Sequence, residues 1–170
     1  MNEMTRELAE GLKRAYLAEV EGEHFYRMAA ATTTDPKGRE VFDRLAAEER
    51  QHQEYLRHQY DAVSTTGSLD ESVKLGQAGA LDEKSPIFSD GLRGRVGEAH
   101  FEMTALSVGA QLELSAEKYY RAEANKIDIP FLKRFYNELA DWEAAHYAAL
   151  SAQQESLRED YWQASGFTPF

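Results

Sequence analysis

The sequence predicts an all-α protein, a four-helix bundle made of two similar helical hairpins joined by one long crossover. Three observations support this fold. The composition favours helix, because 42% of the 170 residues are hydrophobic and only 4 are proline. Apolar residues recur at alternating spacings of three and four along four segments, which is the period of an amphipathic helix. The pattern of the first half of the chain returns in the second half.

The first hairpin begins with a helix expected over residues 5–31. Its apolar stripe contains Leu8, Leu12, Ala15, Tyr26 and Ala29. A polar turn over residues 32–35 should end it. Asp35 is expected to cap the second helix and Pro36 to occupy its first position, because these residue types favour those positions. The stripe of the second helix continues to Val63.

Residues 64–93 are rich in Gly, Ser and Asp, so they predict a long connection, with one short helical turn near residues 71–75. The second hairpin is expected to have helices over residues 96–125 and 130–157. We assign residues 1–160 to the bundle, with 64–93 as its crossover. Residues 161–170 then form an aromatic tail, which is apolar enough that we expect it to cover the bundle or contact a second subunit.

The two hairpins align without a gap when the sequence is shifted by 94 residues. Leu12 then matches Leu106, and Pro36 matches Pro130. One hairpin cannot bury its apolar stripe alone, whereas two hairpins packed together form a four-helix bundle. The short loops make each pair of helices antiparallel neighbours, and a link of about 30 residues permits a single long crossover.

Six polar residues lie within the apolar stripes at positions that should face the core: Glu19, Glu49, His52, Glu113, Glu143 and His146. The Glu-x-x-His spacing places a carboxylate and an imidazole on one helix face, one turn apart. An uncompensated buried charge costs several kcal/mol, against a total stability of about 5–15 kcal/mol. Two divalent cations would balance the four carboxylates.

Carboxylate oxygens with imidazole nitrogens suit iron or manganese and also accept zinc. A Glu from each of two helices with a Glu-x-x-His from each of the other two is the ligand set of di-iron and di-manganese bundles. We therefore expect two iron ions per chain, with manganese or zinc as substitutes. The alternative is that the glutamates are solvated and the repeat reflects duplication alone, but this would leave charges inside stripes that otherwise follow the core period.

The two Glu-x6-Tyr motifs, each followed by Glu-x-x-His, resemble the rubrerythrin branch of the ferritin-like superfamily, over about residues 5–157. The resemblance implies a di-iron carboxylate protein in which Glu49 and Glu143 bridge or chelate the metals. It also implies that Glu19 and Glu113 are terminal ligands and that each metal has one histidine.

The resemblance further implies that Tyr26 and Tyr120 hydrogen-bond to ligand carboxylates. Core packing with a satisfied hydroxyl is the alternative. The sequence departs from the family in two respects. Ala116 stands where peroxide-reducing members carry a further carboxylate, which puts iron movement between alternative ligands in doubt. The chain also has no cysteine and therefore lacks a rubredoxin domain, so a redox cycle would need an external electron donor.

Several further residues are weaker candidates. Glu23 and Glu117 lie one turn beyond Glu19 and Glu113, where they could be extra ligands or line an ion path. A partly exposed helical carboxylate is the simpler interpretation for both. The remaining histidines fall off the ligand faces and are expected at the surface: His24, His58 and His100.

The composition argues against several classes of function. The net charge is −11 and no Lys/Arg cluster is present, so we expect no nucleic-acid partner. Without cysteine, the chain cannot form disulfides, iron–sulfur sites or a thiol nucleophile. No apolar run approaches the length of a membrane span, and the acidic N-terminal segment differs from a signal peptide, so we expect a cytoplasmic protein without a membrane partner.

Three functions remain open, and an enzyme is the favoured one. The first is a di-iron oxidoreductase that reacts with hydrogen peroxide or oxygen and uses an external electron donor. The second is a ferroxidase or iron-handling protein for storage or delivery, and the third is a non-catalytic, metal-stabilised module. Surplus carboxylates near the site would favour iron handling, and an apolar channel beside an open coordination position would favour oxidant chemistry. The aromatic tail suggests a homodimer.

Overall fold

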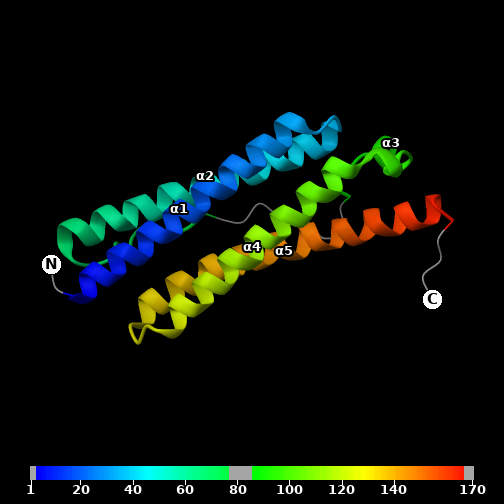
Figure 1. Cartoon of the computed structure of the whole chain (residues 1–170). Coiled ribbons are helices and arrows are strands. Elements are labelled where there is room, and N and C mark those ends of the chain that lie inside the picture. The colour runs from blue at the N-terminus through cyan, green and yellow to red at the C-terminus, as the bar shows by residue number, and fades with distance from the viewer. Residues whose placement is uncertain (1–2, 77–85, 167–170) are drawn as a thin grey trace.

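The computed structural model describes residues 3–76 and 86–166, and within these ranges it contains helices and connections but no strand. Four long helices dominate the described chain: α1 (Glu3–Thr32), α2 (Pro36–Thr66), α4 (His100–Asn125) and α5 (Pro130–Ala164). Helices α1 and α2 pack as one antiparallel pair and α4 and α5 as another, and α1 also lies against α4 (Figure 1). The predicted all-α bundle of two hairpins is confirmed.

The start of α2 is fixed by Asp35, as predicted. Its side chain accepts a hydrogen bond from the Gly38 backbone N–H at 2.9 Å, and Pro36 is the first helical residue. At the other end, Gly67 adopts a left-handed conformation with φ 80°, and its N–H bonds to the Val63 carbonyl. Asp35 also accepts a hydrogen bond from the Ser89 N–H at 3.1 Å, which ties the end of the crossover to the start of α2.

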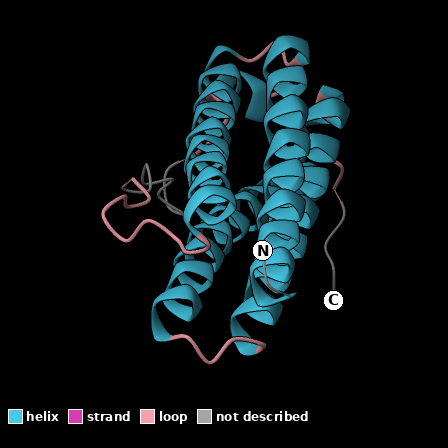
Figure 2. Cartoon of the chain, turned by 90° about the vertical axis from the view of Figure 1, so that its left-hand side faces the viewer, coloured by secondary structure: helices cyan, strands magenta, loops and turns pink. Residues whose placement is uncertain are grey.

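The expectation of a short helical turn near residues 71–75 is wrong, because residues 71–76 contain a turn but no helix. The Asp70 side chain accepts hydrogen bonds from both the N–H and the hydroxyl of Ser72, a local pattern that competes with helix formation. The short helix is α3 (Asp90–Arg93), followed by the 3₁₀ turn η1 (Val96–Glu98), so α4 begins later than expected. Figure 2 shows the described part of this connection outside the helices.

Helix α5 extends beyond the predicted end at residue 157, so residues 161–164 of the expected tail are helical. The Arg158 guanidinium lies 4.6 Å from the centroid of the Trp162 ring, and these residues are four apart, which makes them neighbours on the surface of a helix. Residues 167–170 of the expected tail lie outside the described residues. None of the described helices is long and apolar enough to span a membrane.

The buried apolar residues form two clusters along the bundle. Large residues of the first cluster are Tyr26, Phe42, Leu45, Leu106 and Leu150. Large residues of the second are Leu12, Leu56, Tyr120, Tyr136 and Leu139. Each long helix contributes to both clusters, and its predicted ligand residues lie between the two contributions. The fold therefore places a polar layer in the middle of an apolar core.

Candidate metal centre

The six predicted ligand residues converge in this polar layer. Each has at most 3% of its surface exposed, and all four long helices contribute: α1 provides Glu19, α2 provides Glu49 and His52, α4 provides Glu113, and α5 provides Glu143 and His146. They form two overlapping groups, and in each group the potential ligand atoms lie within 4.8 Å of one another. Positions of the apolar stripe that would normally hold buried Leu or Ala thus hold buried glutamates and histidines here.

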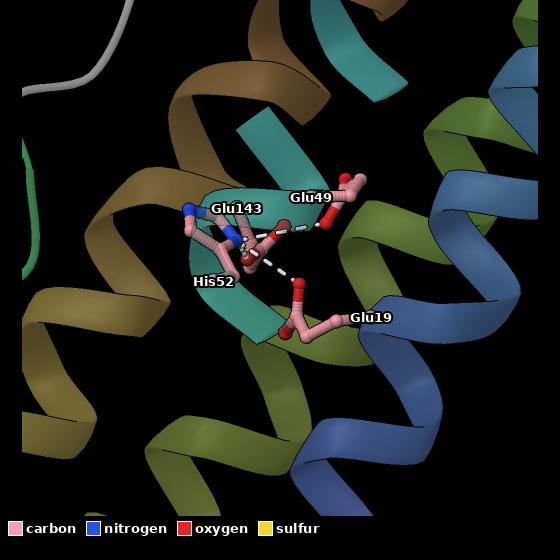
Figure 3. A group of neighbouring side chains, drawn as sticks. All are labelled: Glu19, Glu49, His52 and Glu143. Carbon is pink, nitrogen blue, oxygen red and sulfur yellow. Dashed lines mark hydrogen bonds and ion pairs between the residues drawn. The ribbon is translucent and has the colours of Figure 1, made fainter. Parts of the chain in front are cut away.

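The first group consists of Glu19, Glu49, His52 and Glu143 (Figure 3). Its centre is Nδ1 of His52, which lies 3.0 Å from a carboxylate oxygen of Glu19, 3.3 Å from one of Glu143 and 3.5 Å from one of Glu49. Three carboxylates from three helices therefore face one imidazole nitrogen.

The second group consists of Glu49, Glu113, Glu143 and His146. Nδ1 of His146 lies 3.7 Å from a Glu113 oxygen and 3.9 Å from a Glu143 oxygen. Among the described residues, no group is hydrogen-bonded to this nitrogen. Glu49 and Glu143 belong to both groups, so they lie where a carboxylate can contact two cations at once.

Two tyrosines connect the hairpins through the terminal carboxylates. The Tyr26 hydroxyl of α1 donates a hydrogen bond to Glu113 of α4, and the Tyr120 hydroxyl of α4 donates one to Glu19 of α1. Burial, together with the neighbouring carboxylates, raises the pKa of both phenols well above the usual value, so they remain donors. Each tyrosine fixes one carboxylate in the layer.

The four buried glutamates separate into two kinds. Burial and then repulsion by neighbouring carboxylates raise the pKa of Glu49 and of Glu143 well above the usual value. Burial also disfavours the charged form of Glu19, but attraction to His52 and hydrogen bonds outweigh it and lower the pKa to about 2. In Glu113, burial is likewise outweighed, by interactions with Glu143, His146 and Tyr26, and the pKa is lowered.

Both histidines favour the charged form. Burial alone would lower their pKa values, but the neighbouring glutamates reverse this effect and raise the pKa of His52 and of His146 well above the usual value. Without cations, two imidazolium groups therefore face two carboxylates, while the other two glutamates hold protons. Two divalent cations against four carboxylates give the same neutral total, so the residues fit a metal pair.

A cavity of about 290 Å³ reaches the polar layer from the side where α1 and α4 meet. Its lining includes the carboxylates Glu19, Glu49, Glu113 and Glu143 together with small and exposed residues of α1 and α4. Gly22 and Ala116, which occupy equivalent positions in the repeat, leave this side open. A Cβ atom at Gly22 would lie 3.2 Å from Cδ of Glu49, so a side chain there would press on a candidate ligand.

The weaker candidates lie outside both groups. Glu23 is buried, but it forms an ion pair with Arg50 and accepts a hydrogen bond from Gln53 at 2.9 Å. Glu117 is half-buried and lies 3.7 Å from Arg121. Both carboxylates thus lie next to arginine side chains of the protein. The remaining histidines are exposed: His24, His58 and His100.

Sequence reasoning missed two residues that contact the histidines. Glu48 is buried, and its carboxylate lies 2.8 Å from Nε2 of His146. The Trp142 ring meets the His52 ring edge-on, with centroids 4.7 Å apart. The available signal was their placement, because each directly precedes a Glu-x-x-His motif.

Comparison with known proteins gave one match. The family model described as Rubrerythrin matches residues 5–84, which contain all of α2, α1 from residue 5 onward, and three of the six polar-layer residues. The searches of curated proteins and of solved structures found no match. The second hairpin lies outside the matched range, and its equivalence to the first rests on the internal repeat and on the shared polar layer.

Proposed function

Residues 5–84 form a rubrerythrin domain of the ferritin-like di-iron family, and on this premise we propose that the chain is a di-iron oxidoreductase that reduces hydrogen peroxide or oxygen. In this proposal Glu49 and Glu143, which belong to both groups, would be shared by two iron ions, and His52 and His146 would each hold one of them through Nδ1. Glu19 and Glu113 would be the remaining carboxylate ligands. Oxygen and imidazole donors of this kind suit iron, and manganese or zinc are possible substitutes.

The iron pair, when bound, supplies the electrons for reducing the oxidant. The protein supplies the surroundings. The two apolar clusters exclude water on both sides of the polar layer, and the two tyrosine hydroxyls hold the terminal carboxylates in place. Because ligands from all four helices meet in one layer, folding of the bundle sets the ligand geometry before metal arrives.

The cavity between α1 and α4 is the observation that carries this proposal. It connects the bundle surface with the four carboxylates, and its volume is about 290 Å³. One water molecule occupies about 30 Å³ in the liquid, so the cavity has room for a peroxide or oxygen molecule together with several waters. Gly22 keeps it open beside Glu49, and the small side chain of Ala116 lines it from α4. A cavity of this size beside the site supports the proposal of oxidant chemistry.

Iron handling is the second candidate. The exposed Glu21 lines the cavity, and such a carboxylate favours the passage of cations. The surplus carboxylates Glu23 and Glu117, however, are engaged by arginines and lie outside both candidate groups. This favours the oxidoreductase over storage or delivery of iron.

We further propose that the electron donor is a separate protein or small molecule. The chain has no cysteine, so it cannot provide a thiolate-bound iron or iron–sulfur relay of its own. A homodimer and a cytoplasmic location remain part of the same proposal.

The test is an anaerobic titration with ferrous iron, followed by hydrogen peroxide or oxygen, with the ferric absorbance as the readout. The proposal predicts two irons per chain and fast oxidation. Ala116→Leu should fill the cavity and slow oxidation while the stoichiometry stays at two, and Ala116→Ser is the matched control that leaves the cavity open. Uptake well beyond two irons would favour iron handling. Bound iron that reacts with neither oxidant would favour a non-catalytic module.

A further inference from the structure

The two histidines of the polar layer have different neighbours on the side that faces away from the carboxylate cluster. Nε2 of His146 lies 2.8 Å from a carboxylate oxygen of Glu48. Glu48 is 4% exposed, so this contact is shielded from water. In the whole described chain, Nε2 of His52 is one of three buried side-chain atoms without a hydrogen-bond partner. Its ring instead meets the Trp142 ring edge-on, at an interplanar angle of 72°.

This difference is a break in the internal repeat. The shift of 94 residues that matches Glu49 with Glu143 and His52 with His146 also matches Glu48 with Trp142. The six candidate ligands are therefore the same in the two hairpins, while Glu48 and Trp142, the matched residues that contact the histidine rings, differ. Each of these residues contacts the histidine of the opposite hairpin, because Glu48 lies on α2 and His146 on α5.

We propose that Glu48 makes the two metal positions unequal, so that the position of His146 binds its cation first and more tightly than the position of His52. The inference rests on the metal centre proposed above. A histidine that binds a metal through Nδ1 carries its proton on Nε2. The Glu48 carboxylate can accept a hydrogen bond from this N–H, which fixes the ring orientation and makes Nδ1 a stronger donor.

The position of His52 lacks this support. When Nδ1 of His52 binds a cation, the proton is on Nε2, and no acceptor lies within hydrogen-bonding distance of this atom in the described structure. His52 therefore lacks the fixed ring orientation and the strengthened Nδ1 donor that Glu48 gives to His146. Loss of a carboxylate behind a ligand histidine typically weakens metal affinity by about 10–100-fold, and we expect the two positions to differ by a factor of this size.

The test measures Co(II) affinity in variants that each retain one position. His52→Ala removes the histidine of the first group, and His146→Ala removes that of the second. The first variant should bind Co(II) about 10–100-fold more tightly than the second, read from visible absorbance and calorimetry. Glu48→Gln should then weaken binding in the His52→Ala background and leave it unchanged in the His146→Ala background, which is the matched control. Circular dichroism checks that each variant folds.

A second measurement uses the intact ligand set. The full-length protein should bind Co(II) in two separate phases, and Glu48→Gln should bring the phases together. Equal affinities in the two single-position variants, or an equal effect of Glu48→Gln on both, would overturn the inference and leave the metal centre standing. Absence of Co(II) binding in the unaltered protein would overturn the metal centre itself.

Discussion

Binding of two divalent cations should release about four protons near neutral pH, because every ligand must be deprotonated when it binds. The structure determines which groups lose them. Glu49 and Glu143 have pKa values raised well above normal by burial and by neighbouring carboxylates, so each holds a proton in the metal-free protein. His52 and His146 are imidazolium ions because nearby glutamates raise their pKa values despite burial. Glu19, with a pKa of about 2, has no proton to lose.

The magnitude is large enough to measure directly. Each released proton changes the binding constant tenfold per pH unit, so lowering the pH by one unit should weaken binding of the pair by up to about 10⁴-fold. Calorimetry in several buffers gives the proton number, because the observed heat varies with the ionisation enthalpy of the buffer in proportion to the protons released. Zinc or Co(II) avoids oxidation during this measurement.

Two variants sharpen the assay. Glu49→Gln removes one titrating group and should reduce the release to about three protons. His24→Ala changes an exposed histidine and should leave the number unchanged. A release near zero would refute the reasoning, since it would mean that the buried acids and histidines are already deprotonated in the absence of cations.

Three further predictions concern stability. Glu49→Ala and His146→Ala should each lower metal content and Tm together, since a cation at 1,000 times its Kd stabilises the fold by about 4 kcal/mol; unchanged stoichiometry in both would rule out the site. Tyr120→Phe should cost about 1–3 kcal/mol in urea unfolding of the metal-free protein, because Glu19 loses a buried donor, and a neutral effect would contradict that contact. The metal-free protein should lose stability as the pH rises above about 6.5. The pKa values of His52 and His146 are raised in the folded protein, so the stabilisation that these histidines provide is complete only below 6.5, the pKa of histidine in the unfolded chain. Glu19 acts in the opposite direction, with stability lost as the pH falls from 4.5 toward 2. A Tm that increases from pH 6.5 to 9 without metal would show that this assignment of charges is wrong.

Much of this architecture follows from local sequence signals. The Asp35–Pro36 pair marks the start of α2 because a side-chain acceptor and a residue without an N–H both suit that position. The helical period identifies the six inward-facing polar residues because it is continuous through Leu45, Glu49, His52 and Leu56. Such signals are short-range, and short-range signals decide where a helix starts and which face it buries.

Other features depend on contacts that the sequence period does not encode. The crossover lacks a helix at residues 71–75 because Asp70 forms a local turn with Ser72, and two arrangements of similar local propensity compete there. The helical period did not identify Glu48, because it lies next to Glu49 and off the apolar stripe. Its burial depends on α5 covering that side of α2, which is a tertiary contact.

The internal repeat is broken at Glu48 and Trp142. This break separates the residues that contact the shared centre, which are the same in both hairpins, from the residues that contact the histidines, which differ. Residues that contact the shared centre are the same in both hairpins, because a cation pair needs similar donors from each side. Glu48 and Trp142, which contact the histidines, differ, and in our proposal this difference gives the two cations unequal affinity. A buried carboxylate without a compensating role would cost free energy, and the hydrogen bond to His146 supplies that role. Hence helix α2, which contributes Glu49 and His52 to the symmetric ligand set, also carries Glu48, the residue that makes the two halves unequal.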